Sequence, residues 1–96
     1  MDIEQFRDDD RGYLTWTAAH AAGYVINVQR SLNPGDARLH RADCYTINGQ
    51  PARGNTWTGP YPYIKVCSSS SGHLQDWARS YLRAEVVRCG ACRPPV

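Results

Sequence analysis

The sequence predicts a small α+β domain with a short antiparallel sheet and two helices. Stretches 24–28 and 63–67 are rich in β-branched and aromatic residues, as strands are. Stretch 72–82 carries apolar residues at i, i+3, i+4, i+7 and i+8, the spacing of an amphipathic helix. A CxxC pair near the C-terminus and an HxxxC pair upstream are typical of metal ligands. The domain is therefore expected to be stapled by a zinc ion.

Residues 1–9 are expected to form an acidic, flexible arm, and residues 10–96 a single domain. The first ten residues carry five acidic side chains and one arginine, a composition that cannot bury much surface. Residues 11–96 carry ten Lys and Arg against four acids. A chain of 96 residues has a thin core, which a bound metal would help to stabilise.

The first half of the domain is predicted to contain one helix and two strands. Asp10 is a suitable N-cap for a helix from about Arg11 to Ala22, which Gly23 would end. A strand at 24–28 and a turn at 31–36 follow. A short strand at 37–39 then delivers His40 at its end.

The second half begins with an irregular stretch at 48–62, a length that is uncommon for a loop without a function. Alternation in the next strand places Lys65 and Cys67 on one face and Ile64 and Val66 on the other. Serines before residue 72 offer N-caps for the amphipathic helix, which is expected to end at about Leu82. A last strand at 85–88 leads into the CxxC.

Five side chains compete for the four positions of a tetrahedral zinc site: His40, Cys44, Cys67, Cys89 and Cys92. His40 and Cys44 flank one turn, so a single local conformation can deliver both. Cys67 ends a hydrophobic strand and has no partner at short spacing, which is typical of a small buried residue. The predicted ligand set is therefore His40, Cys44, Cys89 and Cys92. A four-cysteine site without His40 stays open, as do a disulfide pair and redox-active or free thiols.

The basic body of the chain suits a polyanionic partner as well as an ordinary protein surface. Arginine and lysine side chains can hold phosphates, and aromatic side chains in the 48–62 loop can stack on bases or plug the small core. The candidate nucleic-acid contacts are Arg53, Trp57, Tyr61, Lys65, Arg79, Arg83 and Arg88. Arg41, Arg88 and Arg93 also flank the ligands and would offset the negative charge of a thiolate site.

From His40 to Pro95 the chain reads HxxxC, an irregular stretch, a strand, an amphipathic helix, a basic strand and then R-C-G-A-C-R-P. This order resembles the zinc-binding domain of the Ada-type DNA alkylation repair proteins, which carry CxxxC, a strand and helix, and a pattern like R-P-C-K-R-C-R-P. The resemblance covers a little over half of the chain and implies the fold and the metal. The chain also resembles small modules that accompany nucleases.

The resemblance breaks at the residue that matters for repair. In the Ada-type domain the first cysteine of CxxxC accepts a methyl group from a DNA phosphotriester, and here that position holds His40. An imidazole is not an acceptor of that kind, so the alkyl-acceptor function is disfavoured. The sequence indicates a non-enzymatic zinc module that binds DNA or serves a nuclease or DNA-modification system. The alternative is a structural or regulatory domain that binds a protein.

No stretch of the sequence has the 18 apolar residues that a membrane span needs. The acidic N-terminus lacks the apolar core of a secretory signal. A cytoplasmic location is therefore expected, and in a reducing compartment four cysteines more often mark a metal site than disulfides.

Overall fold

The computed structural model describes residues 3–29, 31–32, 35, 37–44, 47, 58 and 63–94. Two helices and five strands lie in this part of the chain, which confirms the predicted α+β class. Their order is β1 (Glu4–Phe6), α1 (Asp10–Ala19), β2 (Tyr24–Gln29), β3 (Arg38–Arg41), β4 (Tyr63–Ser68), α2 (Ser71–Tyr81) and β5 (Val87–Arg88).

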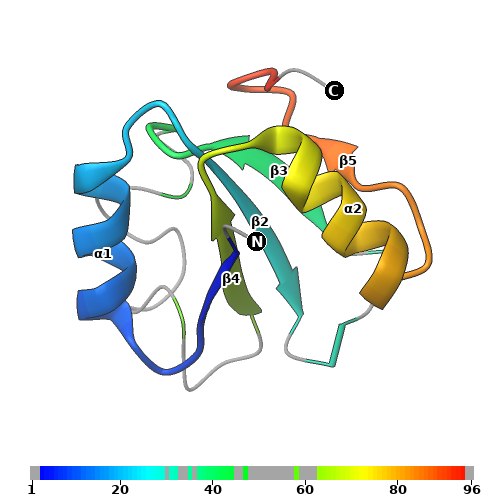
Figure 1. The fold of residues 1–96 in the computed structure, drawn as a ribbon, viewed down its shortest axis with the longest axis horizontal. Helices are drawn as coiled ribbons and strands as arrows, with labels where there is room; N and C mark the ends of the chain where they lie inside the picture. Colours follow the sequence, from blue (N-terminus) through cyan, green and yellow to red (C-terminus); the bar gives the residue numbers. More distant parts are fainter. Residues whose placement is uncertain are drawn as a thin grey trace.

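All five strands form one sheet, in the order β1-β4-β2-β3-β5 (Figure 1). The pairs β1–β4, β4–β2 and β2–β3 are antiparallel, whereas β3 and β5 are parallel. The sheet is therefore mixed and not purely antiparallel as predicted. The reason is that α2 connects β4 to β5 as a crossover over one face of the sheet, so β5 returns in the direction of β4.

Each face of the sheet is covered by one helix, and Figure 1 shows α1 and α2 on opposite sides of it. On one face, core residues of β2, β3 and β4 such as Ile26 and Val66 pack with the α2 residues Leu74 and Trp77. On the other face, Cys67 belongs to a cluster that includes Tyr13 and Trp16 of α1. The predicted alternation along β4 is confirmed, but neither face is left to solvent.

The prediction of an acidic flexible arm at 1–9 is wrong for residues 4–6, which form β1 at the edge of the sheet. Glu4 pairs with Cys67 and Phe6 with Lys65. Phe6 is buried, with its ring in edge contact with Tyr13 at 6.1 Å between centroids, whereas Glu4 and Gln5 stay exposed. Backbone pairing with β4 and burial of the Phe6 ring order this segment. The Glu4 carboxylate stays in water, so the strand forms without burying a charge.

Helix α1 is shorter than predicted and its cap differs by one residue. Asp9 is the N-cap and accepts a hydrogen bond from the Gly12 N–H, and the helix ends at Ala19 with His20 as C-cap. Gly23 therefore lies beyond the helix end. A Cβ at this position would lie 2.8 Å from the Trp16 ring and 3.1 Å from the Ser68 carbonyl, so Gly23 allows α1 and β4 to approach closely.

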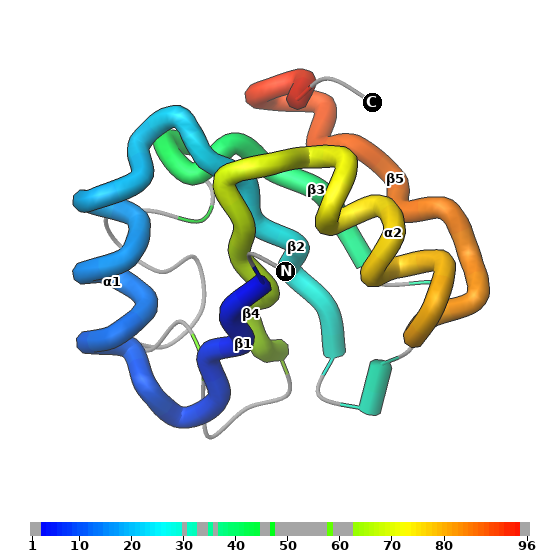
Figure 2. Tube along the Cα trace, in the orientation of Figure 1, coloured from blue at the N-terminus to red at the C-terminus, as the bar shows by residue number. Residues whose placement is uncertain are grey.

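Helix α2 follows the prediction closely, beginning at Ser71 after the N-cap Ser70. Its buried residues Leu74, Trp77 and Ala78 form the expected apolar stripe. The predicted strand at 85–88 is reduced to Val87 and Arg88, and the chain then passes over the end of β3, as the red segment in Figure 2 shows. No helix in the described ranges is long and apolar enough to cross a membrane.

Candidate metal centre

His40 is placed by the alternation of β3. Leu39 points into the core under α2, so His40 faces the other side of the sheet. There it pairs with Val25 of β2. Strand β3 continues to Arg41, so His40 lies within the strand and not after it as predicted. The side chain is 6% exposed. A buried imidazole on a strand has a fixed direction, as a ligand needs.

Cys44 follows β3 after a tight turn. The N–H of Cys44 donates to the Arg41 carbonyl at 3.0 Å, and the N–H of Ala42 donates to the Gly23 carbonyl at 2.9 Å. These bonds fix the turn between the strand and Cys44, whose side chain is 3% exposed and packs in the α1 cluster. The HxxxC pair is thus delivered from the protein interior.

Cys89 and Cys92 come from the turn after β5. The Cys89 N–H donates to the Leu39 carbonyl at 2.8 Å, which continues the parallel pairing of β3 and β5. The Arg93 N–H donates to the Cys89 carbonyl at 3.0 Å and closes the CxxC turn. Both cysteines are half-buried, so this pair closes the site from the solvent side.

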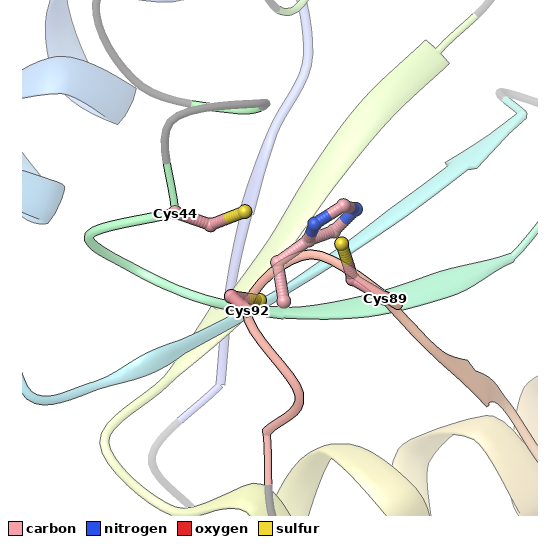
Figure 3. Close-up of side chains that lie close together, drawn as sticks. Cys44, Cys89 and Cys92 are labelled. Carbon is pink, nitrogen blue, oxygen red and sulfur yellow. The ribbon is translucent and has the colours of Figure 1, made fainter.

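The predicted ligands from the two segments come together. One donor atom from each of His40, Cys44, Cys89 and Cys92 lies within 4.8 Å of the other three. Figure 3 shows Cys44, Cys89 and Cys92 converging from two parts of the chain. Tetrahedral zinc with Zn–S bonds of about 2.3 Å places its sulfur ligands about 3.8 Å apart. The donor set and its spread therefore fit a zinc ion after a small contraction.

The protonation chemistry also fits a cation. Burial, with the charges of Lys65 and Arg38 adding to it, lowers the pKa of His40 to about 4, so its imidazole is neutral at pH 7 and has a free lone pair. Burial raises the pKa of Cys92 to about 12, with the neighbouring Cys44 and Cys89 acting in the same direction. Three thiolates this close repel one another, and a bound dication would relieve that repulsion.

Backbone N–H groups already point at two of the sulfur atoms. The Arg41 N–H donates to Cys92 Sγ at 3.2 Å, and the Ala91 N–H donates to Cys89 Sγ at 3.3 Å. Burial acts to raise the pKa of Cys89, but hydrogen bonds from the Cys92 and Ala91 backbones outweigh it and lower the pKa overall. Such donors stabilise thiolate over thiol.

The described residues contain this one group of three or more His, Cys, Asp and Glu side chains with ligand atoms close together. All four of its donors are protein side chains, so a tetrahedral ion would keep no open position for substrate or water. Comparison of the chain with protein-family models, with curated proteins and with solved structures yields no match.

Cys67 is not a member of this group, although it shares a core cluster with Cys44. It is fully buried in the cluster with Phe6, Tyr13 and Trp16. Burial is also the main reason that its pKa lies far above the ordinary thiol value. All four cysteines are free thiols, so no disulfide takes up any of the predicted ligands.

The prediction that Lys65 contacts nucleic acid is wrong. Its side chain is 3% exposed, and its Nζ donates to Asn27 Oδ1 at 2.7 Å and lies 5.8 Å from the centre of the Tyr13 ring. A phosphate contact from Lys65 would require this side of β4 to face solvent. Strand β1 and helix α1 cover that face instead, because Phe6 pairs with Lys65 and packs on Tyr13.

The other candidate nucleic-acid contacts are spread over the molecule. Arg53, Trp57 and Tyr61 lie outside the described residues. Arg79, on the outer face of α2, forms an ion pair with Asp76 at 2.9 Å. Arg83 is exposed just after α2, and Arg88 is exposed on β5. Arg88 is therefore the member of the predicted set that lies closest in sequence to the metal centre.

The sequence did not reveal that Arg41 links the two ligand segments. Its carbonyl accepts from Cys44, whereas its guanidinium Nε donates to the Cys92 carbonyl at 3.0 Å and its Nη2 to the Arg93 carbonyl at 3.4 Å. The position of Arg41 inside the HxxxC motif was the available signal. Sequence spacing cannot show which carbonyls a flexible side chain reaches.

Proposed function

We propose that this chain is a non-enzymatic binding module whose fold is held by one structural zinc ion, with DNA as its partner. The observation that carries the metal part is the convergence of His40, Cys44, Cys89 and Cys92 from two segments more than forty residues apart in sequence. A closed Cys3His set is typical of structural zinc. The metal would join the turn after β3 to the turn after β5.

The role of the zinc follows from how short the backbone pairing of the C-terminal segment is. Strand β5 has two residues, and it is paired on one side, to β3. Beyond it, the described hydrogen bonds to the rest of the chain are few, several of them from Arg41, whereas Pro94 is buried and the two cysteines pack against the α1 cluster. Zinc binding would therefore contribute directly to the free energy of folding of this segment.

The DNA part of the proposal rests on charge. Residues 11–96 carry six more basic than acidic side chains, and the arginines near the metal centre are exposed. Backbone phosphates attract such a surface without sequence preference. The resemblance to the Ada-type domain supports a zinc module that works on DNA, whereas His40 at the acceptor position argues against alkyl transfer. A role as accessory to a nuclease or DNA-modification system fits this proposal.

Metal analysis tests the first part. Protein purified without added chelator should contain about one zinc per chain by elemental mass spectrometry, and a strong chelator should lower its unfolding temperature. Protein with two disulfides and no metal would overturn the zinc site. Fluorescence anisotropy with a labelled duplex tests the second part, and no binding even at low salt would leave a protein partner as the better explanation.

A further inference from the structure

Three arginines lie around the metal centre, and none of them forms an ion pair with a carboxylate of the described residues. Arg41, Arg88 and Arg93 are all exposed. The guanidinium of Arg41 donates to the carbonyls of Cys92 and Arg93, and Nη1 of Arg88 donates to the Pro94 carbonyl at 3.4 Å. Three consecutive carbonyls therefore fix two guanidinium groups beside the third arginine.

The sheet brings these arginines together. Arg88 pairs with Leu39 in the parallel β3–β5 ladder, and Arg41 lies two residues further along β3, on the same face as Leu39. The CxxC turn then returns Arg93 to the same place, since its N–H donates to the Cys89 carbonyl. Side chains separated by about fifty residues thus share one short edge of the molecule.

The charges of these arginines are not neutralised by acids in the described part of the chain, where the ion pair joins Arg79 to Asp76 instead. The negative charge of a zinc-loaded metal centre does not account for three arginines either. A zinc ion with three thiolates and a neutral imidazole has a net charge of −1, which one arginine would balance. Three arginines leave an excess of two positive charges at this edge.

We infer that Arg41, Arg88 and Arg93 form an anion-binding edge that contacts the phosphodiester backbone of DNA. This inference rests on the proposed function and names the surface that carries it. Carbonyl contacts leave most of the N–H donors of each guanidinium free, and a held arginine loses less conformational entropy when it binds a phosphate. Contacts to phosphates position a protein on DNA but do not read its sequence. The edge should therefore bind duplexes of different sequence equally.

The edge also depends on the metal. The carbonyls that hold Arg41 and Arg88 belong to residues 92–94, which directly follow the CxxC. If zinc is removed, this segment loses one of its anchors and the three charges are held together less firmly. DNA binding is therefore expected to weaken when zinc is removed, even though the metal does not touch the DNA.

The test uses the zinc-loaded full chain and a fluorescein-labelled 20-base-pair duplex, with affinity measured by anisotropy from 50 to 200 mM salt. Arg88→Gln and Arg93→Gln together should weaken binding at least tenfold at 50 mM salt. Their combination should also reduce the slope of log K against log salt by about 0.9 for each phosphate that the variant no longer neutralises. The double Arg→Lys variant keeps the charge and should retain most of the affinity.

Arg7→Gln and Arg11→Gln are matched controls, because both remove an exposed arginine elsewhere, and they should change affinity less than twofold. Zinc content is measured for every variant. If wild type binds DNA and the zinc-loaded double Gln variant binds it equally well, the anion-binding edge is wrong. The proposed function is then left intact. Absence of wild-type binding at 50 mM salt overturns both the edge and the DNA partner. Loss of affinity in the controls as large as in the double variant overturns the localisation to this edge.

Discussion

The backbone N–H of Arg41 donates a hydrogen bond to Sγ of Cys92 at 3.2 Å, across 51 positions of the sequence. This one bond joins the strand that carries His40 to the turn that carries the CxxC. Because the same residue also accepts from the Cys44 N–H, both halves of the candidate metal centre are built around Arg41. The ligands are thus positioned by backbone and carbonyl contacts that exist independently of the ion.

Separate replacement of His40 and Cys67 tests the ligand set. His40→Ala should weaken zinc binding by more than about tenfold, because loss of a group that merely orients a ligand already costs 10–100-fold. Cys67→Ala is the matched control and should keep about one zinc per chain. Since Cys67 is fully buried, this variant should lose about 1 kcal/mol of unfolding free energy through the missing sulfur.

Competition with a chromophoric chelator measures both affinities, and denaturant unfolding measures the stabilities. The reverse pattern, in which Cys67→Ala loses zinc and His40→Ala retains it, would establish a four-cysteine site. Loss of zinc in both variants would show that folding and not ligation was disturbed, which the circular dichroism of each variant would reveal.

The sequence predicted the grouping of the four candidate ligands better than it predicted the sheet. His40, Cys44, Cys89 and Cys92 are recognisable because ligand chemistry and short spacing are local properties of a chain. The buried stripe of α2 and the alternation of β4 are local in the same sense. The pairing of β1 with β4 and of β5 with β3 is not a local property, because it depends on which distant strand has an unpaired edge.

Lys65 shows the same limit at the level of one side chain. Its position in an alternating strand indicates which neighbours share its face, and Cys67 does share it. Whether that face is exposed to water depends on β1 and α1. Their segment, residues 4–19, carries four acids, and its sequence does not indicate that it covers a face of the sheet. The role of Gly23 could not be predicted for the same reason. A glycine is needed there because the backbone lies close to Trp16, and not because it ends the helix.

Zinc removal should loosen the C-terminal segment before the rest of the domain. Strand β5 has two residues and lies at the edge of the sheet, whereas β2 is paired along its whole length with β4. In the chelated protein the amides of Cys89 and Arg93 should exchange with solvent at least tenfold faster, while those of Ile26 and Val66 change much less. Hydrogen–deuterium exchange with zinc and with chelator measures this difference. Equal acceleration in β2 and β4 would show instead that the metal holds the whole fold.

Thr58 should anchor its segment of the chain to the start of α1. It is fully buried, and its N–H and Oγ1 both lie 2.7 Å from Asp10 Oδ1 as donors. Its Oγ1 also accepts from the Asp9 N–H at 2.7 Å. Thr58→Val keeps the shape but leaves the Asp9 N–H without its acceptor and removes one of the two donors to Asp10 Oδ1, so it should cost about 1–3 kcal/mol of unfolding free energy.

Thr15→Val is the control for the Thr58 variant, because Thr15 is exposed in α1 and the same atoms change. Its effect should stay within about 0.5 kcal/mol. Urea unfolding of the three proteins with zinc present gives the comparison. Equal stabilities for Thr58→Val and wild type would mean that the hydroxyl contributes nothing to holding the start of α1.

Stability should rise with pH above about 8 because of Lys65. Burial lowers the pKa of Lys65 from 10.5 to about 8 in the folded protein, whereas the unfolded chain has the ordinary value. Below pH 8 both states carry the proton, and the full cost of burying the ammonium is present. Between pH 8 and 10.5 the unfolded state binds more protons than the folded state, so stability increases with pH. The total effect is about 3 kcal/mol, from 1.36 kcal/mol for each pKa unit.

Lys65→Met isolates this effect, because Met fills a similar space without a titrating group. Other thiols and tyrosines titrate in the same pH range, so the informative quantity is the difference in unfolding free energy between wild type and variant. At pH 7 this difference should favour the variant, reduced by the bond that Lys65 Nζ donates to Asn27 Oδ1. By pH 10.5 wild type should have gained about 3 kcal/mol relative to Lys65→Met. Stability curves that run parallel from pH 7 to 10.5 would mean that Lys65 keeps an ordinary pKa, and that its ammonium is solvated despite its position under α1.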